Sequence, residues 1–364
     1  MPTKPKKILF LVPYPLKESP SQRFRFEQYF ALLSEKGFTF EIHSFLKSNN
    51  WRLFFKPGKL LRKASILFIG FIRRLLLLLR ARRFDFIFIH REVTPVGPPI
   101  FEWLLSQLLQ KKIIYDFDDA IWLADKKDEA WYLRFVKWRR KVGAICRWSY
   151  KVSSGNVYLA SFAKQYNSNV VVNPTTIDTA AVHNPSLFPT EKSKKQGIVI
   201  GWTGSHSTLK YLVGSAAILS QIEVAFPNVQ FMVIADRRPN LRLNNMLFVP
   251  WSYESEIQDL LSIDIGIMPL PNDKWTKGKC GFKALQYMAL KIPAIASPVG
   301  VNNQIIDHGI NGFLCSTPEE WSSALTKLIK DKELRQQMGE HGRNKVIDHY
   351  SVESNSSLFL KLFE

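Results

Sequence analysis

Short apolar runs alternate with stretches of helical periodicity along the whole chain. Residues 8–12 are apolar and strand-like, 25–36 show a helical pattern that ends at Gly37, and 38–45 are again strand-like. This β-α-β order with a glycine helix stop predicts a parallel sheet covered by helices on both faces. The same pattern predicts further helices over 59–82, 100–109 and 129–151, and further strands over 84–89, 112–115, 155–159 and 170–172.

The second half of the chain repeats the alternation after a proline-containing stretch, 174–196, that ends in a charged run. We therefore expect an α/β protein of two doubly wound, Rossmann-like domains that face each other across a cleft, where ligands of open α/β sheets bind. The expected domains are 1–178 and 197–345, joined by a linker over 179–196 and followed by a helix over 346–364 that packs back on the first domain. In the second half, strands are expected over 197–201, 229–235, 263–268 and 294–297, helices over 208–225, 254–261, 281–290, 304–307 and 318–330, and two terminal helices over 331–364.

Composition agrees with two folded domains in a reducing compartment. The chain has 364 residues, 46% of them hydrophobic and 22% charged, which excludes a largely disordered protein. Its three cysteines are odd in number and far apart, which argues against a disulfide framework and a cysteine zinc site. The first apolar run is too short for a signal peptide and no small-residue cleavage site follows it. We expect a cytoplasmic protein.

Positive charge is concentrated in the first half. The net charge is +19, of which +17 falls in residues 1–178 and +2 in 179–364. No acid occurs between Glu41 and Asp85. A field of one sign attracts an anionic surface. The eleven bases in that interval are Lys47, Arg52, Lys56, Lys59, Arg62, Lys63, Arg73, Arg74, Arg80, Arg82 and Arg83.

The same segment is also rich in apolar residues. Arg73 and Arg74 divide it into runs over 64–72 and 75–79, which are too short to span a membrane. One reading is a buried helix whose arginines point to solvent, and the other adds docking on the anionic inner leaflet of a membrane. Nucleic acid is the competing anion, but the chain has no helix-turn-helix, zinc-finger, RNP or KH pattern. We favour the membrane and expect no nucleic acid.

Three turns in the second half have residues suited to binding phosphate. Gly201, Gly204 and Ser205 follow a strand and precede a helix, the basic stretch 274–283 does the same, and 297–303 follows the next strand. Backbone N–H groups, helix starts and ammonium groups together suit a diphosphate. Taken singly, each is also compatible with an ordinary surface turn, and the first lacks a complete dinucleotide or P-loop fingerprint.

The stretch 281–297, followed by Gly300 and 307–314, resembles the donor-binding signature of glycosyltransferase family 4, whose members have the GT-B fold. Weaker similarity extends to 173–178, 201–204 and 350–351. The resemblance implies transfer of a sugar from a nucleotide diphosphate sugar with retention of configuration and without a metal or other cofactor. The donor-binding residues it implies, together with the phosphate turns, are Gly201, Gly204, Ser205, Lys210, Lys279, Lys283, Gln286 and Gly300.

Two departures from the family pattern concern carboxylates. The two glutamates of the family signature fall on Gly278 and Gln286, and Gln304 stands where a further glutamate is common. The Gln286 amide can still bond a ribose hydroxyl, because it has a donor and an acceptor. The contacts to the donor sugar, and hence the sugar itself, are not defined by these residues.

Charged residues in the first half follow strands and are expected at the cleft. Asp116, Asp118 and Asp119 come after one strand, and His90 ends another. We expect Asp116, Asp118 and His90 to be catalytic, polarising or holding an acceptor hydroxyl, and Asp119 to bind the acceptor. A manganese site, a helix N-cap and a structural histidine are the alternatives.

Arg23 and Arg25 follow the first strand and are expected to bind an anionic group of the acceptor or donor. A helix start with solvated arginines is the alternative.

The favoured function is a glycosyltransferase of the hexosyltransferase type that builds a cell-envelope glycan or glycolipid at the inner face of the membrane. Its expected partners are a nucleotide diphosphate sugar, a glycan or lipid-linked acceptor and an anionic membrane surface. The alternatives are a nucleotide-sugar epimerase or phosphorylase of the same fold, and a non-catalytic, membrane-associated protein that binds nucleotide sugars.

Overall fold

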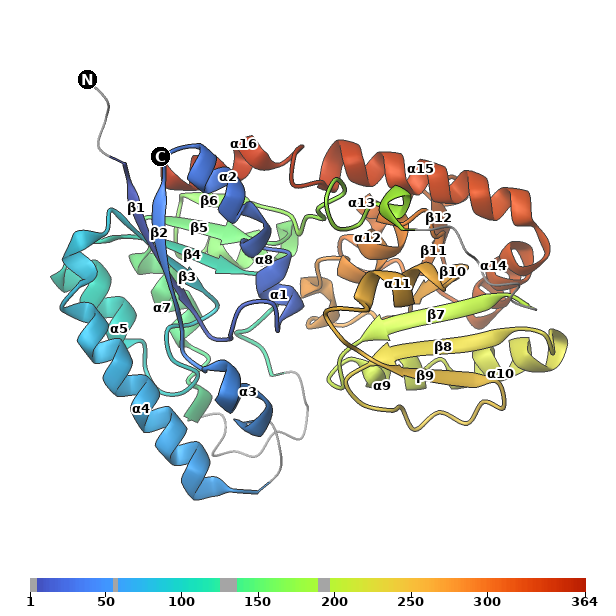
Figure 1. The fold of residues 1–364 in the computed structure, drawn as a ribbon, viewed down its shortest axis with the longest axis horizontal. Coiled ribbons are helices and arrows are strands. Elements are labelled where there is room, and N and C mark those ends of the chain that lie inside the picture. Colours follow the sequence, from blue (N-terminus) through green and yellow to red (C-terminus); the bar gives the residue numbers. More distant parts are fainter. Residues whose placement is uncertain (1–4, 55–57, 125–135, 189–196) are drawn as a thin grey trace. The chain divides into compact units, whose positions relative to one another are not determined.

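The computed structural model describes residues 5–54, 58–124, 136–188 and 197–364. The chain divides into two compact units, each with its own six-stranded sheet (Figure 1). Unit 1 comprises Met1–Thr175 and Ser356–Glu364, and unit 2 comprises Thr176–Asn355. Residues 189–196 of the expected linker and the beginning of the helix expected over 129–151 lie outside the described residues.

The sheet of unit 1 is parallel throughout, with the strand order β2-β1-β3-β4-β5-β6. The first strand pairs with the second on one side and the third on the other, so the direction of winding reverses between β1 and β3. Ligands of open α/β sheets bind at the carboxyl ends of strands beside such a reversal. The strands are β1 (Lys7–Val12), β2 (Thr39–Ser44), β3 (Phe86–His90), β4 (Lys112–Phe117), β5 (Lys151–Ser154) and β6 (Val170–Val172).

An aromatic core joins the sheet of unit 1 to the end of the chain. Phe10 of β1 packs against Phe26 and Phe88, with ring centroids 5.5 and 4.9 Å away. Phe359 stacks on Tyr29 at 4.1 Å, and both side chains are buried. The helices of unit 1 are α1 (Pro20–Arg23), α2 (Phe30–Glu35), α3 (Ser48–Phe54), α4 (Leu60–Leu78), α5 (Ile100–Trp103), α7 (Lys141–Trp148), α8 (Val157–Ala163) and α16 (Ser356–Leu360).

Residues 155–159 were expected to form a strand, and this prediction is wrong. The strand β5 lies earlier, and α8 begins at Val157. Asn156 explains the change, because its side chain accepts a hydrogen bond from the Leu159 backbone N–H at 2.8 Å and so caps the helix. Apolar residues such as Val157 fit either element, and the cap decides between them.

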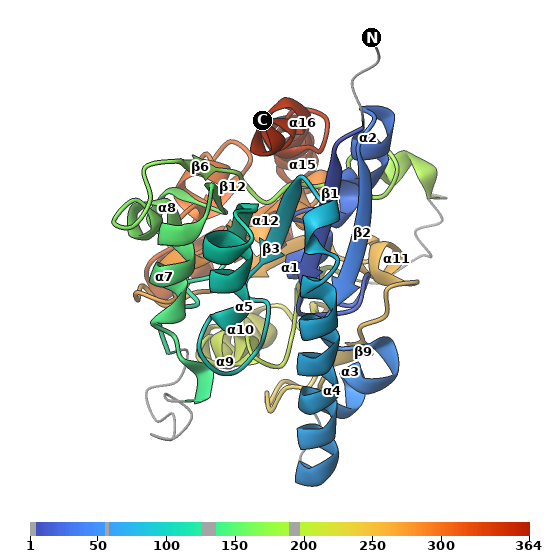
Figure 2. The same cartoon turned by 90° about the vertical axis from the view of Figure 1, so that its left-hand side faces the viewer.

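Helix α4 lies along the outside of unit 1 (Figures 1 and 2), and its arginine pair does not point to solvent as one reading of the sequence required. Arg74 is buried and donates to three backbone carbonyls, those of Val12 and His43 at 2.9 Å and of Val93 at 3.1 Å. Arg73 donates to the Ser44 carbonyl at 3.1 Å. Within the described residues, no helix is both long and apolar enough to cross a membrane.

The sheet of unit 2 is also parallel, with the order β12-β11-β10-β7-β8-β9 and a reversal between β7 and β10. This is the strand order of the dinucleotide-binding doubly wound fold. Two of its strands, β9 and β12, were not expected from the sequence. The strands are β7 (Val199–Gly204), β8 (Gln230–Ala235), β9 (Met246–Pro250), β10 (Ile265–Met268), β11 (Ala294–Ala296) and β12 (Gly312–Leu314).

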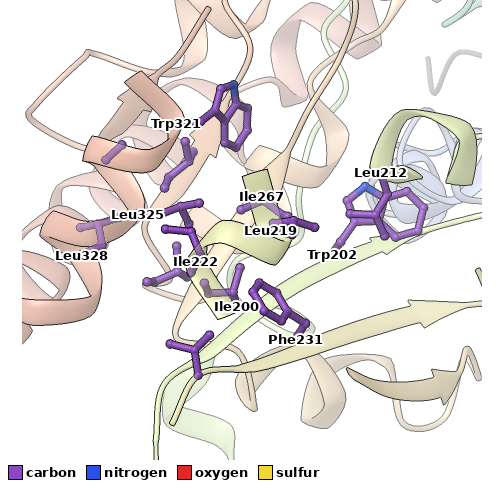
Figure 3. Close-up of a cluster of buried hydrophobic side chains, with 14 of the residues drawn as sticks. Ile200, Trp202, Leu212, Leu219, Ile222, Phe231, Ile267, Trp321, Leu325 and Leu328 are labelled. Atoms are coloured by element: carbon purple, nitrogen blue, oxygen red, sulfur yellow. The ribbon is translucent and has the colours of Figure 1, made fainter. Parts of the chain in front are cut away.

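Helices pack on the sheet of unit 2 through a large apolar cluster (Figure 3). Ile200 and Phe231 of the sheet meet Leu219 of α10 and Leu325 of α14 in this cluster. The helices are α9 (Leu209–Val213), α10 (Ala216–Ala225), α11 (Glu256–Leu261), α12 (Phe282–Ala289), α13 (Asn302–Ile305), α14 (Pro318–Lys330) and α15 (Lys332–Tyr350).

Candidate functional site

A buried ion-pair cluster lies at the carboxyl edge of the unit 1 sheet. His90 and Asp116 are register partners on the adjacent strands β3 and β4. The His90 Nδ1 lies 2.8 Å from Asp116 Oδ2, and neither side chain is exposed. Pairing in register places both groups beside the reversal between β1 and β3, where the fold favours a ligand.

Arg25 neutralises the Asp116 carboxylate from the other side. Its Nη2 contacts Asp116 Oδ1, its Nε lies 3.3 Å from Oδ2, and Ser153 donates to Oδ1 at 2.6 Å. Burial alone would raise the pKa of Asp116, but Arg25 and His90 outweigh burial and hold this pKa well below its ordinary range. The Asp116 carboxylate is therefore ionised at neutral pH, has no exposed surface, and is held in place by Arg25, His90 and Ser153.

Ser21 connects this buried cluster to a partly exposed carboxylate. Its Oγ lies 2.8 Å from His90 Nε2 and donates to Asp118 Oδ1 at 2.9 Å. The result is a continuous chain of hydrogen bonds from Asp116 through His90 and Ser21 to Asp118.

Arg91 holds the outer two carboxylates. Its Nη2 lies 2.8 Å from Asp118 Oδ1 and 2.6 Å from Asp119 Oδ2, and its backbone adopts a left-handed φ of 59°. Burial would raise the pKa of Asp118, but Arg91 and then His90 outweigh it and lower this pKa. Few non-glycine residues take this backbone conformation, and such positions cluster at functional sites.

Ser21 and Arg91 were not expected from the sequence to be site residues. A signal for Arg91 was present, because three carboxylates within four residues need nearby cations, and Arg91 directly follows His90. No comparable signal marked Ser21, whose role depends on where α1 brings it.

The expected catalytic and acceptor-binding residues of unit 1 therefore form two layers. Asp116, His90 and Arg25 are sealed inside, whereas Asp118 and Asp119 are partly exposed. Arg23 is also buried, with its guanidinium 4.9 Å from the centre of the Phe24 ring. In the described part of the chain, no group of three or more His, Cys, Asp or Glu side chains is arranged to hold a metal ion.

Three loops converge at the carboxyl edge of the unit 2 sheet, after the adjacent strands β7, β10 and β11. Gly300 has a φ of 58°, and a Cβ there would lie 2.9 Å from the Lys277 carbonyl oxygen, so the loops after β10 and β11 touch. Lys283 Nζ lies 5.3 Å from the ring of Trp202 on β7. The expected phosphate turns are thus brought together.

The three lysines expected to bind the donor each lie near an aromatic ring. Lys279 is partly buried, with its Nζ 5.5 Å from the Trp275 ring centre, and Lys283 is partly buried beside Trp202. Lys210 on α9 is exposed, and its Nζ lies 5.1 Å from the Tyr211 ring. Stacking over a ring favours an ammonium group and fixes its place.

Glycine is required at the end of β7. A Cβ on Gly204 would lie 2.4 Å from the Trp202 indole. The next turn is tied by its own hydroxyls, since Ser205 Oγ lies 2.8 Å from Ser207 Oγ and Thr208 Oγ1 donates to the Ser205 carbonyl at 3.0 Å. This turn therefore has the tight glycine packing of a phosphate-binding turn. It also has the hydroxyl-capped geometry of an ordinary surface turn, which the sequence left open as the alternative.

Tyr287 of α12, which was not expected from the sequence to be a site residue, contacts both strands at the reversal between β7 and β10. Its hydroxyl accepts from the Thr203 N–H at 2.9 Å, and its ring fills the space that Gly266 leaves open. Burial raises the pKa of this phenol well above its ordinary value, so the hydroxyl keeps its proton. A buried tyrosine thereby sets the spacing of the two strands whose loops form the edge.

Gln286 lies inside unit 2, although it was expected to bind the donor. Its side chain is buried, and its Nε2 lies 3.3 Å from His183 Nε2. The amide thus has a partner inside unit 2, and its contact with a ribose stays a prediction.

Comparison with known proteins supports a glycosyltransferase. Residues 233–345 match the family model described as Glycosyl transferases group 1. The chain is 32% identical over 89 residues to N-acetyl-alpha-D-glucosaminyl L-malate synthase of Bacillus anthracis, covering 24% of this chain and 23% of that protein. It is 36% identical over 75 residues to alpha-1,3/1,6-mannosyltransferase ALG2 of Homo sapiens, covering 20% and 18%. The matches thus span less than a quarter of these curated relatives.

Solved structures share the fold over nearly the whole chain. A glycosyltransferase from Rickettsia africae has a TM-score of 0.69 at 16% identity and covers 99% of this chain and 98% of its own. Sucrose-phosphate synthase from Thermosynechococcus elongatus has a TM-score of 0.68 at 13% identity, covering 98% and 99%. Anabaena Alr3699/HepE in complex with UDP and glucose has a TM-score of 0.64 at 14% identity, covering 98% and 99%.

The fold is that of GT-B glycosyltransferases, with two Rossmann-like domains. The family-model match covers the Lys279, Lys283 and Gly300 loops of unit 2. The fold and the matched segment together support the assignment of this chain to the GT-B glycosyltransferase superfamily.

Proposed function

We propose that the protein is a retaining glycosyltransferase that moves a sugar from a nucleotide diphosphate sugar to a glycan or lipid-linked acceptor of the cell envelope. The observation that carries the proposal is the convergence of three loops with Lys279 and Lys283 at the carboxyl edge of unit 2, inside the segment that matches the family model. UDP and UDP-glucose are bound by solved proteins of similar fold, which supports a nucleotide sugar as the donor.

In this proposal the unit 2 edge binds the diphosphate of the donor. Negative charge grows on the leaving diphosphate as its bond to the sugar breaks, so donors of positive charge stabilise the transition state. Lys279 and Lys283 supply that charge, and the glycine turns at Gly204 and Gly300 let backbone N–H groups approach phosphate oxygens. Neutralisation by lysines and backbone groups makes a metal or other cofactor unnecessary for this step.

The unit 1 edge binds the acceptor in the same proposal. Asp118 and Asp119 are the partly exposed carboxylates, and they accept hydrogen bonds from acceptor hydroxyls. Asp116, His90 and Ser21 act behind them, because their hydrogen-bond chain fixes the Asp118 carboxylate that the acceptor meets. Ser21 and His90 are positioning residues in this scheme.

The absence of the two family glutamates favours a second candidate function, that of a non-catalytic protein. Gly278 and the buried Gln286 provide no carboxylate to hold the donor sugar. A non-catalytic protein that binds nucleotide sugars would tolerate this loss, whereas a transferase must hold the sugar with other groups. Nucleotide-sugar binding without transfer to any acceptor would favour the second candidate.

We further propose that the protein works in the cytoplasm as a peripheral protein on the inner face of the membrane. A lipid-linked acceptor is confined to that surface, and the excess charge of residues 1–178 suits an anionic leaflet.

The test is calorimetric binding of UDP, GDP and ADP to the wild type and to Lys279→Ala and Lys283→Ala. A hydrogen bond to a charged group contributes about 1.5–3 kcal/mol, so each variant should bind its nucleotide about 10- to 100-fold more weakly. Lys327→Met is the matched control, because Lys327 also lies over an aromatic ring, 5.9 Å from the centre of Phe313, but on α14. Unchanged affinity in both variants, or no binding of any nucleotide, would contradict the donor site.

A transfer assay with UDP-glucose and a lipid extract then separates the two candidates. Release of UDP that depends on the extract supports the transferase, whereas tight binding without release supports the non-catalytic protein.

A further inference from the structure

Helix α4 presents an apolar surface on the side that faces away from unit 1. Its buried positions, Ile66, Gly70, Arg74 and Leu77, follow one side of the helix. The opposite side forms what we call the outer stripe, where the exposed fractions of the large apolar side chains lie between 41% and 87%. An ordinary surface helix has polar residues there. The outer stripe consists of Leu61, Phe68, Ile69, Ile72, Leu75, Leu76 and Leu79.

The inner contacts of α4 fix this orientation. A Cβ on Gly70 would lie 2.5 Å from the ring of Phe45, so only glycine allows the close approach seen there. Arg74 donates to the carbonyls of Val12, His43 and Val93. Rotating the helix to hide the outer stripe would leave this buried guanidinium and three carbonyls without their partners, at a large cost in free energy. The outer stripe therefore stays exposed, because buried contacts on the other side of the helix prevent it from rotating.

Exposed bases surround the outer stripe. Lys59 and Arg62 lie at the beginning of α4, and Arg82 and Arg83 lie just beyond its end, all exposed. No acid occurs from residue 42 to residue 84. Of the nearby bases, Arg80 is paired with Glu41 at 3.1 Å. Large apolar side chains between two clusters of unbalanced positive charge match the layers of an anionic membrane, with acyl chains inside and phosphate headgroups outside.

We propose that the outer stripe of α4 docks unit 1 on an anionic lipid membrane, with the helix lying in the plane of the interface. With 19 residues, the helix would lie along about 28 Å of that surface. Phe68, Ile69 and Leu76 enter the acyl boundary while the flanking lysine and arginine groups contact headgroup phosphates. This inference deepens the proposed function and rests on it for one point, the reason why the protein should meet a membrane at all.

Charge and chemistry favour lipid over the other occupants of such a surface. A second copy of the chain on the same face would bring two clusters of bases together with no acid in the segment to pair them. Single-stranded nucleic acid needs aromatic platforms for base stacking, and Phe68 is the one aromatic residue of the outer stripe.

Vesicle co-sedimentation tests the proposal on the full-length protein without any sugar nucleotide. The wild type should bind vesicles of phosphatidylcholine with phosphatidylglycerol, bind pure phosphatidylcholine far more weakly, and be released by salt. The triple variant Phe68→Ser, Ile69→Ser, Leu76→Ser should lose binding while circular dichroism and melting temperature stay unchanged, because all three side chains are exposed. Val224→Ser is the matched control, since Val224 of α10 is also an exposed apolar residue on a helix, 82% accessible.

The bases are tested separately with Arg62→Gln, Lys63→Gln, Arg82→Gln and Arg83→Gln. Each replacement should lower partition onto anionic vesicles about fivefold at low salt. Binding that ignores lipid charge, or absence of binding in the wild type, would overturn the proposal. So would a wild-type dimer, seen by sedimentation equilibrium, that the triple serine variant abolishes.

The outcome is independent of sugar transfer. Nucleotide affinity measured on the same proteins should be equal in the wild type, the triple variant and the control. Docking without nucleotide binding would contradict the proposed function alone, whereas nucleotide binding without docking would contradict the membrane surface alone.

Discussion

The carboxyl edges of the two sheets contain different kinds of residue. In unit 1 the edge consists of charges bonded to one another, Asp116 with Arg25 and His90, and Asp118 with Arg91. In unit 2 it consists of glycines with tight contacts, such as Gly204 and Gly300, and lysines that lie over aromatic rings. One edge consists of paired charges, and the other combines tight glycine turns with lysines beside aromatic rings.

The difference shows two ways in which the same kind of sheet can prepare a site. A cluster of paired charges has fixed geometry before any ligand arrives, which suits the recognition of hydroxyl groups by held carboxylates. A glycine-rich edge with lysines combines close backbone approach with ammonium groups, which suits an anionic ligand. Mutations should therefore affect folding at the first edge and affinity at the second.

The largest effect should come from Asp116→Ala, because it leaves Arg25 buried without its carboxylate. Breaking a buried ion pair costs about 3–5 kcal/mol, and urea denaturation should show a loss of that size in the free energy of unfolding. Asp118→Asn is the comparison at the same edge. Its carboxylate is partly exposed and Arg91 keeps Asp119 as a partner in this variant, so we expect a smaller loss of about 1.5–3 kcal/mol, a lower kcat and unchanged nucleotide affinity.

Equal stability losses in Asp116→Ala and Asp118→Asn would contradict the division of the unit 1 edge into a sealed and an exposed layer. The double variant Arg25→Met, Asp116→Leu checks the cause. Removing both charges should restore part of the stability, because the buried guanidinium is removed together with its carboxylate.

Acid should weaken unit 1 before unit 2, which is the next largest effect. The pKa values of Asp116 and Asp118 are lowered in the folded protein from an ordinary value of 3.8, so the unfolded chain binds protons more readily. Their contribution to stability is complete above that ordinary value and is lost as the pH falls toward the folded values. Glu27 and Glu102 have raised pKa values and act in the opposite sense, gaining stability as the pH falls toward their ordinary 4.5.

In unit 2, Glu319 and Glu320 also have lowered pKa values, and both lie at the surface. Amide exchange at pH 6 and pH 3, corrected for intrinsic rates, should show protection lost first in β3 and β4 of unit 1. Simultaneous loss in both units, or earlier loss in unit 2, would show that the buried pairs of unit 1 do not decide acid stability.

The smallest effect should follow Gly300→Ala in unit 2. Its φ of 58° costs an alanine about 1–2 kcal/mol, and the new Cβ would press on the Lys277 carbonyl. Gly309→Ala is the matched control, because its φ is 81° but nothing lies within 4 Å of the new Cβ. Both variants should be slightly less stable in thermal melts, and Gly300→Ala alone should weaken nucleotide binding. Equal nucleotide affinity in the two variants would show that the Gly300 turn does not contact the nucleotide.

Hydrophobic periodicity predicted most helices and strands. It failed for a helix that is defined by its cap and for two short strands at the sheet edges. The capped helix α14 was expected over 318–330 and begins and ends there. Residues 155–159 were read as a strand because the capping role of Asn156 depends on a hydrogen bond that periodicity does not contain. The strands β9 and β12 lie at the two edges of their sheet and have only five and three residues, which is too short for periodicity to identify them.

The residue types along the chain predicted the positions of the site residues better than they predicted which side chains contact them. Asp116, Asp118 and His90 follow strands and do lie together at one edge. The pairing of Asp116 with Arg25, 91 positions apart, depends on the strand order and could not be read from spacing. Gln286 shows the same limit, because its contact with His183 crosses 103 positions.

The division of the chain has a consequence for synthesis on the ribosome. Residues 356–364 belong to unit 1, but the whole of unit 2 is translated before them. Phe359, Leu362 and Phe363 are fully buried, so nascent unit 1 lacks part of its core until these residues leave the exit tunnel. Unit 2 is contiguous in sequence, so its fold needs no residue from another part of the chain. The first part of the protein to be made is therefore the last to be finished.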